Sequence, residues 1–260
     1  MADSAIATGG SRAVLARAPL LAVMLAGSAL LLIALAPLGW RLGLWHFRFS
    51  FFTLMTWSGY LAAAGVVVSL LALLVSFAGV IERRGALEAG AALIISAILV
   101  YVPWQWDRIR TTVPPIHDIS TDTDNPPAFV AVMPARQAEQ ANTTEYGGAD
   151  LARLQKGYYT DLAPVTTKLA PADAFKRALD TAQGMSGWRI VATDPQAGRI
   201  EASQSSFWFG FTDDVVIRVV PEEAGSRIDM RSEARQGRSD FGKNAERIRN
   251  YMAAVKPAVG

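Results

Sequence analysis

The order of apolar and polar residues divides the chain into two unlike parts. No charged residue occurs between Arg17 and Arg41, and two further long uncharged stretches follow. A helix rising 1.5 Å per residue needs about 20 apolar residues to cross the roughly 30 Å hydrocarbon layer of a bilayer. The pattern therefore predicts about three transmembrane helices in residues 1–110, with spans at about 18–39, 59–81 and 88–106.

The first of these stretches also resembles a signal peptide in its basic start. It is longer than the usual hydrophobic core of such a peptide, and further spans follow, so we expect a retained helix. Lys and Arg flank the predicted spans equally, four on each side, and the positive-inside rule gives no orientation. A cytoplasmic N-terminus with three spans would place the rest of the chain outside the cytoplasm.

An aromatic segment joins the first two predicted spans. Residues 40–57 contain three Trp and four Phe. Amphipathic aromatic rings favour the level of the lipid headgroups. We consider two interpretations: an aromatic belt between two helices, or a docking surface for another membrane subunit.

The remaining residues show the periodicities of a soluble domain. Residues 111–150 are rich in Pro, Asp and Thr, which oppose helix formation, and they predict an extended linker. Residues 151–260 predict an α+β domain. The sequence indicates a helix over 172–183, strands over 188–193, 199–206, 215–220 and 227–235, and a second helix that begins near Ser239 and ends at Pro257.

Short turns between the strands favour an antiparallel meander. The expected fold is therefore an α-β-β-β-β-α domain with helices on one face of the sheet and the opposite face free for water, membrane or a partner. In the last strand, Ile228 and Met230 alternate with Asp229, Arg231 and their charged neighbours. This alternation predicts one buried face and one solvated face.

Composition excludes several kinds of function. The chain has no cysteine, so it has no disulfide, thiolate metal site or cysteine nucleophile. Residues 1–110 carry eight Lys and Arg against four Asp and Glu, and residues 111–260 carry 17 against 19. Neither part has the concentrated basic face that nucleic-acid binding needs, and we expect no nucleic-acid partner.

Two clusters of side chains are candidate binding sites. The first is a possible metal site, because hard cations take oxygen ligands: His117, Asp118, Asp122 and Asp124. The alternative is that these side chains bond nearby amides in turns. The second is a possible anion or lipid-headgroup site at the start of the last helix, where free amides and the helix dipole favour negative charge: Arg235, Arg238, Ser239, Asp240, Lys243 and Asn244. Its alternative is an internally paired structural loop.

No arrangement of residues predicts catalysis. Asp213 and Asp214 are adjacent carboxylates that could serve acid–base chemistry, but the sequence shows no nucleophile or basic partner at a fixed spacing. We therefore predict no catalytic residues and no cofactor.

Four strings in the C-terminal part carry a family resemblance: IHDISTDTDNPPAF, GWRIVATD, FGFTDDVVIRV and SRIDMRSEARQGRSDFGKNAERI. In this order they resemble the family called domain of unknown function 1499 over about residues 114–255. Ala234 departs from the Ser expected in the family's R-S-x-S-R string. Members of the family resemble secreted lipoproteins, lumenal plastid proteins or membrane-anchored bacterial proteins, which implies an extracytoplasmic domain and no particular activity. Besides the candidates above, the resemblance marks Asp213, Asp214, Arg218 and Arg231 for testing.

These observations lead to three hypotheses. The first is a non-enzymatic protein of the bacterial inner membrane whose periplasmic domain binds a protein partner of the envelope or an anionic lipid at the bilayer. The second is a membrane-bound, metal-assisted hydrolase that uses the cluster around His117. The third is a structural accessory subunit of a larger membrane complex.

Overall fold

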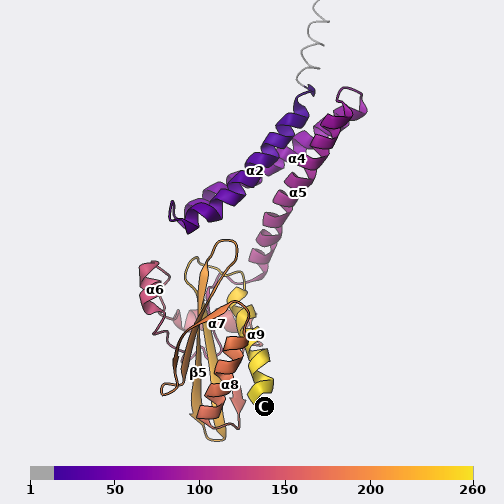
Figure 1. Cartoon of the computed structure of the whole chain (residues 1–260). Coiled ribbons are helices and arrows are strands. Elements are labelled where there is room, and N and C mark those ends of the chain that lie inside the picture. The colour runs from indigo at the N-terminus through magenta and orange to yellow at the C-terminus, as the bar shows by residue number, and fades with distance from the viewer. Residues whose placement is uncertain (1–14, 260) are drawn as a thin grey trace, which may run out of the picture. The chain divides into compact units, whose positions relative to one another are not determined.

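The computed structural model describes residues 15–259, and the chain forms two compact units that divide between Arg108 and Ile109 (Figure 1). Residues 1–14, which belong to the predicted membrane region, lie outside the described residues. The described residues confirm the predicted α+β class: three long apolar helices precede a domain built on an antiparallel sheet.

The first unit contains the membrane helices. They are α2 (Ala18–Arg41), a continuous helix made of α3 (Phe47–Phe49), the π-helical turn η1 (Ser50–Met55) and α4 (Thr56–Phe77), and α5 (Arg83–Thr112). Three helical segments are long and apolar enough to cross a bilayer: Ala18–Arg41, Phe47–Phe77 and Arg83–Gln105. The second helix begins upstream of its predicted span, so most of the aromatic segment is helical.

Small residues allow the membrane helices to approach one another closely. Ala22, Ala26 and Ala29 of α2 are buried, whereas many of the leucines in these helices are exposed on the outside of the helix group. A Cβ atom added at Gly65 of α4 would lie only 2.5 Å from the Ser96 Oγ of α5. Ser58 Oγ donates a hydrogen bond of 2.9 Å to the Ala29 carbonyl. Close packing and hydrogen bonds between helices are the main sources of helix association in lipid, where no hydrophobic driving force acts between helices.

The second unit is the α+β domain. Its elements are β1 (Asp118–Ser120), α6 (Met133–Ala138), α7 (Gly148–Tyr158), β2 (Val165–Thr167), α8 (Pro171–Gly184), β3 (Trp188–Asp194), β4 (Arg199–Ser205), β5 (Thr212–Glu222), β6 (Gly225–Ala234) and α9 (Lys243–Val259). The predicted α-β-β-β-β-α order is confirmed by α8, β3 to β6 and α9. The short strands β1 and β2 were not predicted, and both pair with β6 in a sheet of order β1-β6-β5-β4-β3.

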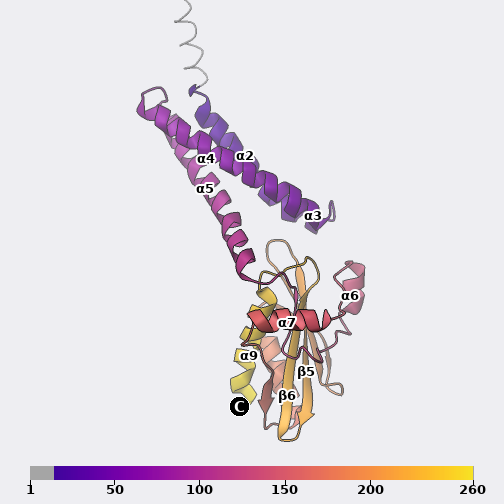
Figure 2. The same ribbon diagram turned by 180° about the vertical axis from the view of Figure 1, so that it is seen from behind.

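Helices α8 and α9 lie side by side against one face of this sheet (Figures 1 and 2). Ile200, Ile217 and Met230 sit in register on three neighbouring strands and are fully buried beneath these helices. Tyr251 of α9 donates a hydrogen bond of 2.9 Å to the Ala178 carbonyl of α8. The apolar stripe of each helix and the apolar face of the strands thus form one core, as their periodicities predict.

The boundaries of α9 differ from the prediction. The helix begins at Lys243, not near Ser239, because Phe241 and Gly242 take positive φ angles of 54° and 80° that interrupt a right-handed helix. It also continues through Pro257 to Val259. A proline in the last turn removes few hydrogen bonds, and its fixed φ suits a helix, so the predicted stop at Pro257 is wrong.

The segment 111–150 also differs from the extended linker that was expected. Part of it pairs with the sheet as β1, and α6 lies on the side of the sheet away from α9 (Figures 1 and 2). Phe129 and Val132 pack on Val216 of β5. The second face of the sheet is therefore covered, and the prediction of a free, solvated face is wrong.

Candidate functional site: a buried arginine and carboxylate network

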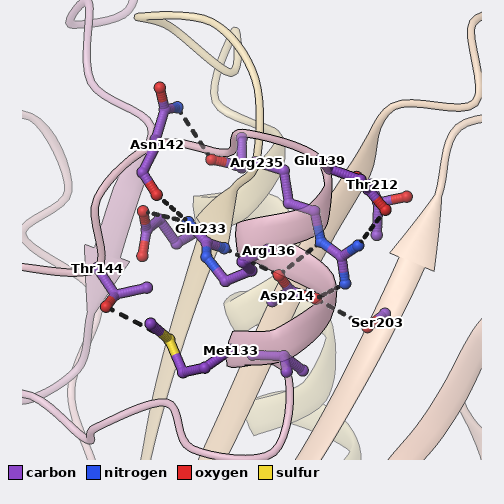
Figure 3. Close-up of polar contacts among 12 residues, drawn as sticks. Met133, Arg136, Glu139, Asn142, Thr144, Ser203, Thr212, Asp214, Glu233 and Arg235 are labelled. Atoms are coloured by element: carbon purple, nitrogen blue, oxygen red, sulfur yellow. Dashed lines mark hydrogen bonds and ion pairs between the residues drawn. The ribbon is translucent and has the colours of Figure 1, made fainter.

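Charged side chains fill the space between the second face of the sheet and the covering segment, residues 113–146, which packs on that face. Asp214 of β5 faces Glu233 of β6 in the strand register, and Arg235 follows Glu233 by two residues. Residues two apart on a strand point to the same side of a sheet. Arg136 of α6 reaches the same place from the covering segment, as Figure 3 shows.

Asp214 lies at the centre of this network. Arg235 binds it through two parallel hydrogen bonds of 2.8 Å, Arg136 Nη1 through one of 2.9 Å, and Ser203 Oγ donates another of 2.8 Å. Arg136 Nη2 also binds Glu233 Oε1 at 2.7 Å. Asp214 and Glu233 have no exposed surface, and Arg136 and Arg235 are 2% and 3% exposed. Buried charges are stable only when they are paired and hydrogen-bonded, and each of these four side chains has at least one such partner.

Arg231 forms a second centre beside the first. Its guanidinium binds both carboxylate oxygens of Asp118 at 2.8 Å and donates to the Thr144 carbonyl. The rings of Phe129 and Tyr146 lie 5.0 and 5.5 Å from the guanidinium carbon. Cation–π contacts of this kind add to the stability of a desolvated arginine. Both aromatic residues and Thr144 belong to the covering segment, which Arg231 thus binds to the sheet.

Two further contacts fix the covering segment. Glu201 of β4 is fully buried, and its carboxylate accepts the backbone N–H groups of residues 130, 131 and 132 at 2.9 to 3.1 Å. Arg218 and Arg227 both bind Asp122 Oδ2, at 2.9 and 2.6 Å. Burial acts to raise the pKa of Asp122, but hydrogen bonds from backbone amides and the charge of Arg227 outweigh it and lower the pKa.

The protonation of Glu233 is strongly altered by its surroundings. Burial, together with the negative charge of Asp118, raises its pKa to about 8, despite the opposing charges of Arg136 and Arg231. Its Oε2 atom accepts no hydrogen bond and lies 3.5 Å from Arg231 Nη2. A general acid or base must come within hydrogen-bonding reach of its substrate. Glu233 has no exposed surface, so the network holds this unusual carboxyl group away from any substrate.

Comparison with known proteins gives one match. Residues 118–255 match the model of a family described as protein of unknown function (DUF1499). The chain belongs to this family. No curated protein and no solved structure matches it. The match begins at β1 and ends within α9, so the DUF1499 domain includes both the sheet and the segment that covers its second face.

The DUF1499 domain separates the residues of the predicted metal cluster. Asp118 binds Arg231, Asp122 binds Arg218 and Arg227, and Asp124 lies 3.4 Å from Lys156. His117 contributes its carbonyl oxygen, which accepts hydrogen bonds from the Ala234 amide and the Asn244 side chain. Within residues 15–259 as described, no three His, Asp or Glu side chains are placed to hold a metal ion.

The predicted anion site is also divided. Arg235 belongs to the buried network, whereas Arg238 is exposed. Asp240 accepts the backbone N–H groups of Gly242 and Asn244, each at 2.8 Å. Asp240 therefore satisfies the amides that an anion would use, and burial raises its pKa.

Other contacts complete the description of these six residues. Ser239 Oγ accepts the Phe241 amide, Lys243 pairs with Glu246, and Asn244 accepts the Ser232 hydroxyl at 2.7 Å. The loop from residue 235 to 242 is thus mostly paired within the domain. Arg238 is its exposed cation.

The adjacent acids Asp213 and Asp214 point to opposite faces of β5. Asp213 binds Arg247 of α9 at 2.7 Å, and burial raises its pKa. Asp214 lies in the network on the other face. Since neighbouring residues on a strand alternate between faces, the two carboxylates do not form an acid–base pair.

Sequence reasoning did not find Arg136 as a member of the network. Arg136 carries no local motif, because it is one charged residue in a short polar stretch. Its role depends on partners far away in the chain. An indirect signal was present in β6, where charged residues alternate with apolar ones. If the charged face of this strand is buried, its side chains need partners of opposite charge nearby.

Proposed function

We propose that this membrane-anchored protein is a non-enzymatic module of the cell envelope, whose DUF1499 domain is extracytoplasmic and binds a partner at the membrane. The single observation that carries the proposal is that charged side chains on the second face of the sheet are paired inside the domain. Asp214, Glu233, Arg231 and Arg136 are all buried and bound to one another or to the covering segment. Such a network builds a rigid platform, and binding is left to the exposed loops.

The hydrolase hypothesis receives less support. It would use His117 and the acidic side chains near it, but Asp118 and Asp122 are bound by arginines at 2.6 to 2.9 Å. A carboxylate held by two guanidinium hydrogen bonds must give them up before it can bind a cation. The site is therefore better suited to holding the covering segment than to holding a metal.

The sidedness of the domain can be tested by cysteine labelling, because the chain has no cysteine of its own. Glu223→Cys places a thiol in the exposed turn between β5 and β6. In intact cells from which the outer membrane has been removed, we expect a membrane-impermeant maleimide to label this thiol. The matched control is Glu82→Cys, between the second and third helices, which should react only after lysis. The opposite pattern would place the domain in the cytoplasm.

Binding can be tested by extracting the full chain with its surrounding lipid and identifying what is retained. The control is the same chain ended after Thr112, which keeps the membrane helices and lacks the domain. We expect a protein or lipid that is enriched with the full chain and lost from the shortened one. If both chains retain the same set, the domain is not the binding part, and the accessory-subunit hypothesis is favoured.

A further inference from the structure

The loop between β4 and β5 presents two large aromatic side chains to the solvent. Phe207 is 90% exposed and Trp208 is 50% exposed. Leaving such rings in water forgoes the free energy that their burial would give, so exposed aromatic pairs often mark an interaction surface.

The loop is a formed structure, which makes this exposure a property of the fold. The Phe211 amide donates to Ser206 Oγ, and the Ser206 amide donates to the Phe211 carbonyl. Gly210 has a φ of 71°, which closes the turn, and its amide bonds the Ser206 carbonyl. The Phe209 and Phe211 rings stack with their centroids 5.1 Å apart. These contacts hold Phe209 inside and direct the two preceding rings outward.

The loop lies at the end of the sheet where the chain enters the domain. His117 bonds Ala234 of β6, Ala234 is in register with Asp213 of β5, and Asp213 is in register with Gln204 of β4. These four residues form one row across the strands. Strands are about 4.8 Å apart, so the base of the loop is about 15 Å along this row from the entry of the chain.

The chain that joins this row to the membrane is short. The third apolar segment ends at Gln105, and α5 continues to Thr112, which adds about 10 Å of helix. Residues 113–116 add at most about 14 Å when fully extended. The length of this tether therefore limits the distance between the bilayer and the entry end of the sheet to about 24 Å.

We infer that the β4–β5 loop inserts Phe207 and Trp208 into the surface of the lipid bilayer. The inference rests on the proposed function and names lipid as a partner of the domain. Two rings at the tip of one loop suit the headgroup level of a membrane, where amphipathic aromatic side chains partition. Because the tether is short, the loop meets the bilayer at a high effective concentration. A protein partner that diffuses freely does not have this advantage.

Charge at the same end of the domain is consistent with a lipid surface. Arg238 is exposed in the loop that follows β6, and the amide of Asp240 in that loop bonds the Ile116 carbonyl at the chain entry. A cation near anionic headgroups adds electrostatic attraction. The β4–β5 loop therefore presents two aromatic rings, and the positive charge of Arg238 lies in the loop that follows β6.

The test uses the full chain in liposomes that contain anionic lipid. A nitroxide is attached to Phe207→Cys, with Glu223→Cys at the opposite end of the sheet as the matched control. We expect the label at position 207 to collide with oxygen dissolved in the bilayer and to be shielded from a water-soluble nickel complex, while the label at 223 shows the reverse. Equal exposure of both labels to nickel would overturn the inference.

A second measurement leaves Phe207 in place. Lipids brominated on their acyl chains should quench the part of the fluorescence that disappears in Trp208→Phe, whereas an unquenched component would contradict insertion. The two proposals can fail separately. A protein partner that is retained by the domain while position 207 stays in water would overturn this inference and leave the proposed function standing.

Discussion

Arg136 joins the covering segment to the sheet through two carboxylates, one on each of two neighbouring strands. It binds Asp214 at 2.9 Å and Glu233 at 2.7 Å, and all three side chains are buried. A buried ion pair contributes little compared with an apolar replacement of both partners. Removing Arg136 is different, because Glu233 then loses the hydrogen bond to its Oε1 atom in a medium of low dielectric constant, and Asp214 keeps only Arg235 and Ser203.

Arg136→Ala should therefore lower the free energy of unfolding of the domain by about 3–5 kcal/mol. Arg153→Ala is the control, since Arg153 pairs with Asp150 on the surface, where both side chains are more than 80% exposed; it should change the free energy by less than about 1 kcal/mol. Proteolysis of the full chain in detergent, at increasing urea, measures both. Equal resistance of the two variants would show that the network does not hold the fold.

Glu233 gives the stability of the domain a pH dependence of known sign. Its pKa is about 8 in the folded domain against an ordinary value of 4.5, so the folded state holds the proton more tightly than the unfolded state. Its contribution to stability is complete below pH 4.5 and is lost as the pH rises toward 8, at no more than about 1.4 kcal/mol per pH unit.

Glu233→Gln removes this titration and leaves the shape of the side chain almost unchanged. The difference in unfolding free energy between pH 5 and pH 8 should be smaller in this variant than in the native chain. Urea unfolding at both pH values, with the same protein in detergent, measures it. The other acids with raised pKa values, Asp213 and Asp240, are common to both proteins and cancel in the comparison. An unchanged difference would mean that Glu233 is ionised throughout.

At the scale of elements, α9 is capped by Asp240, although the sequence predicted a helix start near Ser239. The Asp240 carboxylate accepts the backbone N–H groups of Gly242 and Asn244 at the start of α9. The hydroxyl of Ser239 accepts the Phe241 amide, which lies before the helix. Asp240→Ala should destabilise the domain by about 0.5–2 kcal/mol, because the amides of Gly242 and Asn244 lose their acceptor.

Asp240→Asn is the matched variant, since its single carbonyl oxygen can still accept one amide. Hydrogen exchange of the Gly242 and Asn244 amides should therefore be slow in the native chain, intermediate in Asp240→Asn and fast in Asp240→Ala. The same exchange rates in all three proteins would contradict the assigned cap.

The sequence predicted the elements that carry their own periodicity. The four main strands, α8 and α9 each have an apolar pattern long enough to be recognised, and their order was confirmed. Strands β1 and β2 have three residues each, which is too short for a pattern. The covering segment reads as turns, because its Pro, Asp and Thr residues favour turns locally.

The same distinction explains how much of the network could be predicted. The charges of β6 were visible in the sequence, but Arg231 pairs with Asp118 and Glu233 with Arg136, each across about 100 residues of chain. No local rule connects such positions. Their pairing follows from the path of the covering segment, which only the tertiary structure gives.

At the scale of the whole molecule, three apolar helices anchor a DUF1499 domain whose sheet carries a buried network of charged side chains. The central claim is that residues 113–146 are an integral part of this domain. They supply Asp118 and Arg136, and the backbone amides that Glu201 binds. Without them, Arg231, Glu233 and Asp214 would lose essential partners.

The most direct test compares two soluble fragments, residues 113–260 and residues 151–260. We predict that the longer fragment unfolds cooperatively in urea, as one transition in far-ultraviolet circular dichroism. The shorter one should show no cooperative transition, since it keeps the whole meander and both flanking helices but lacks Asp118, Arg136 and the backbone amides that bind Glu201. A cooperative transition in residues 151–260, at a urea concentration similar to that of the longer fragment, would contradict the account.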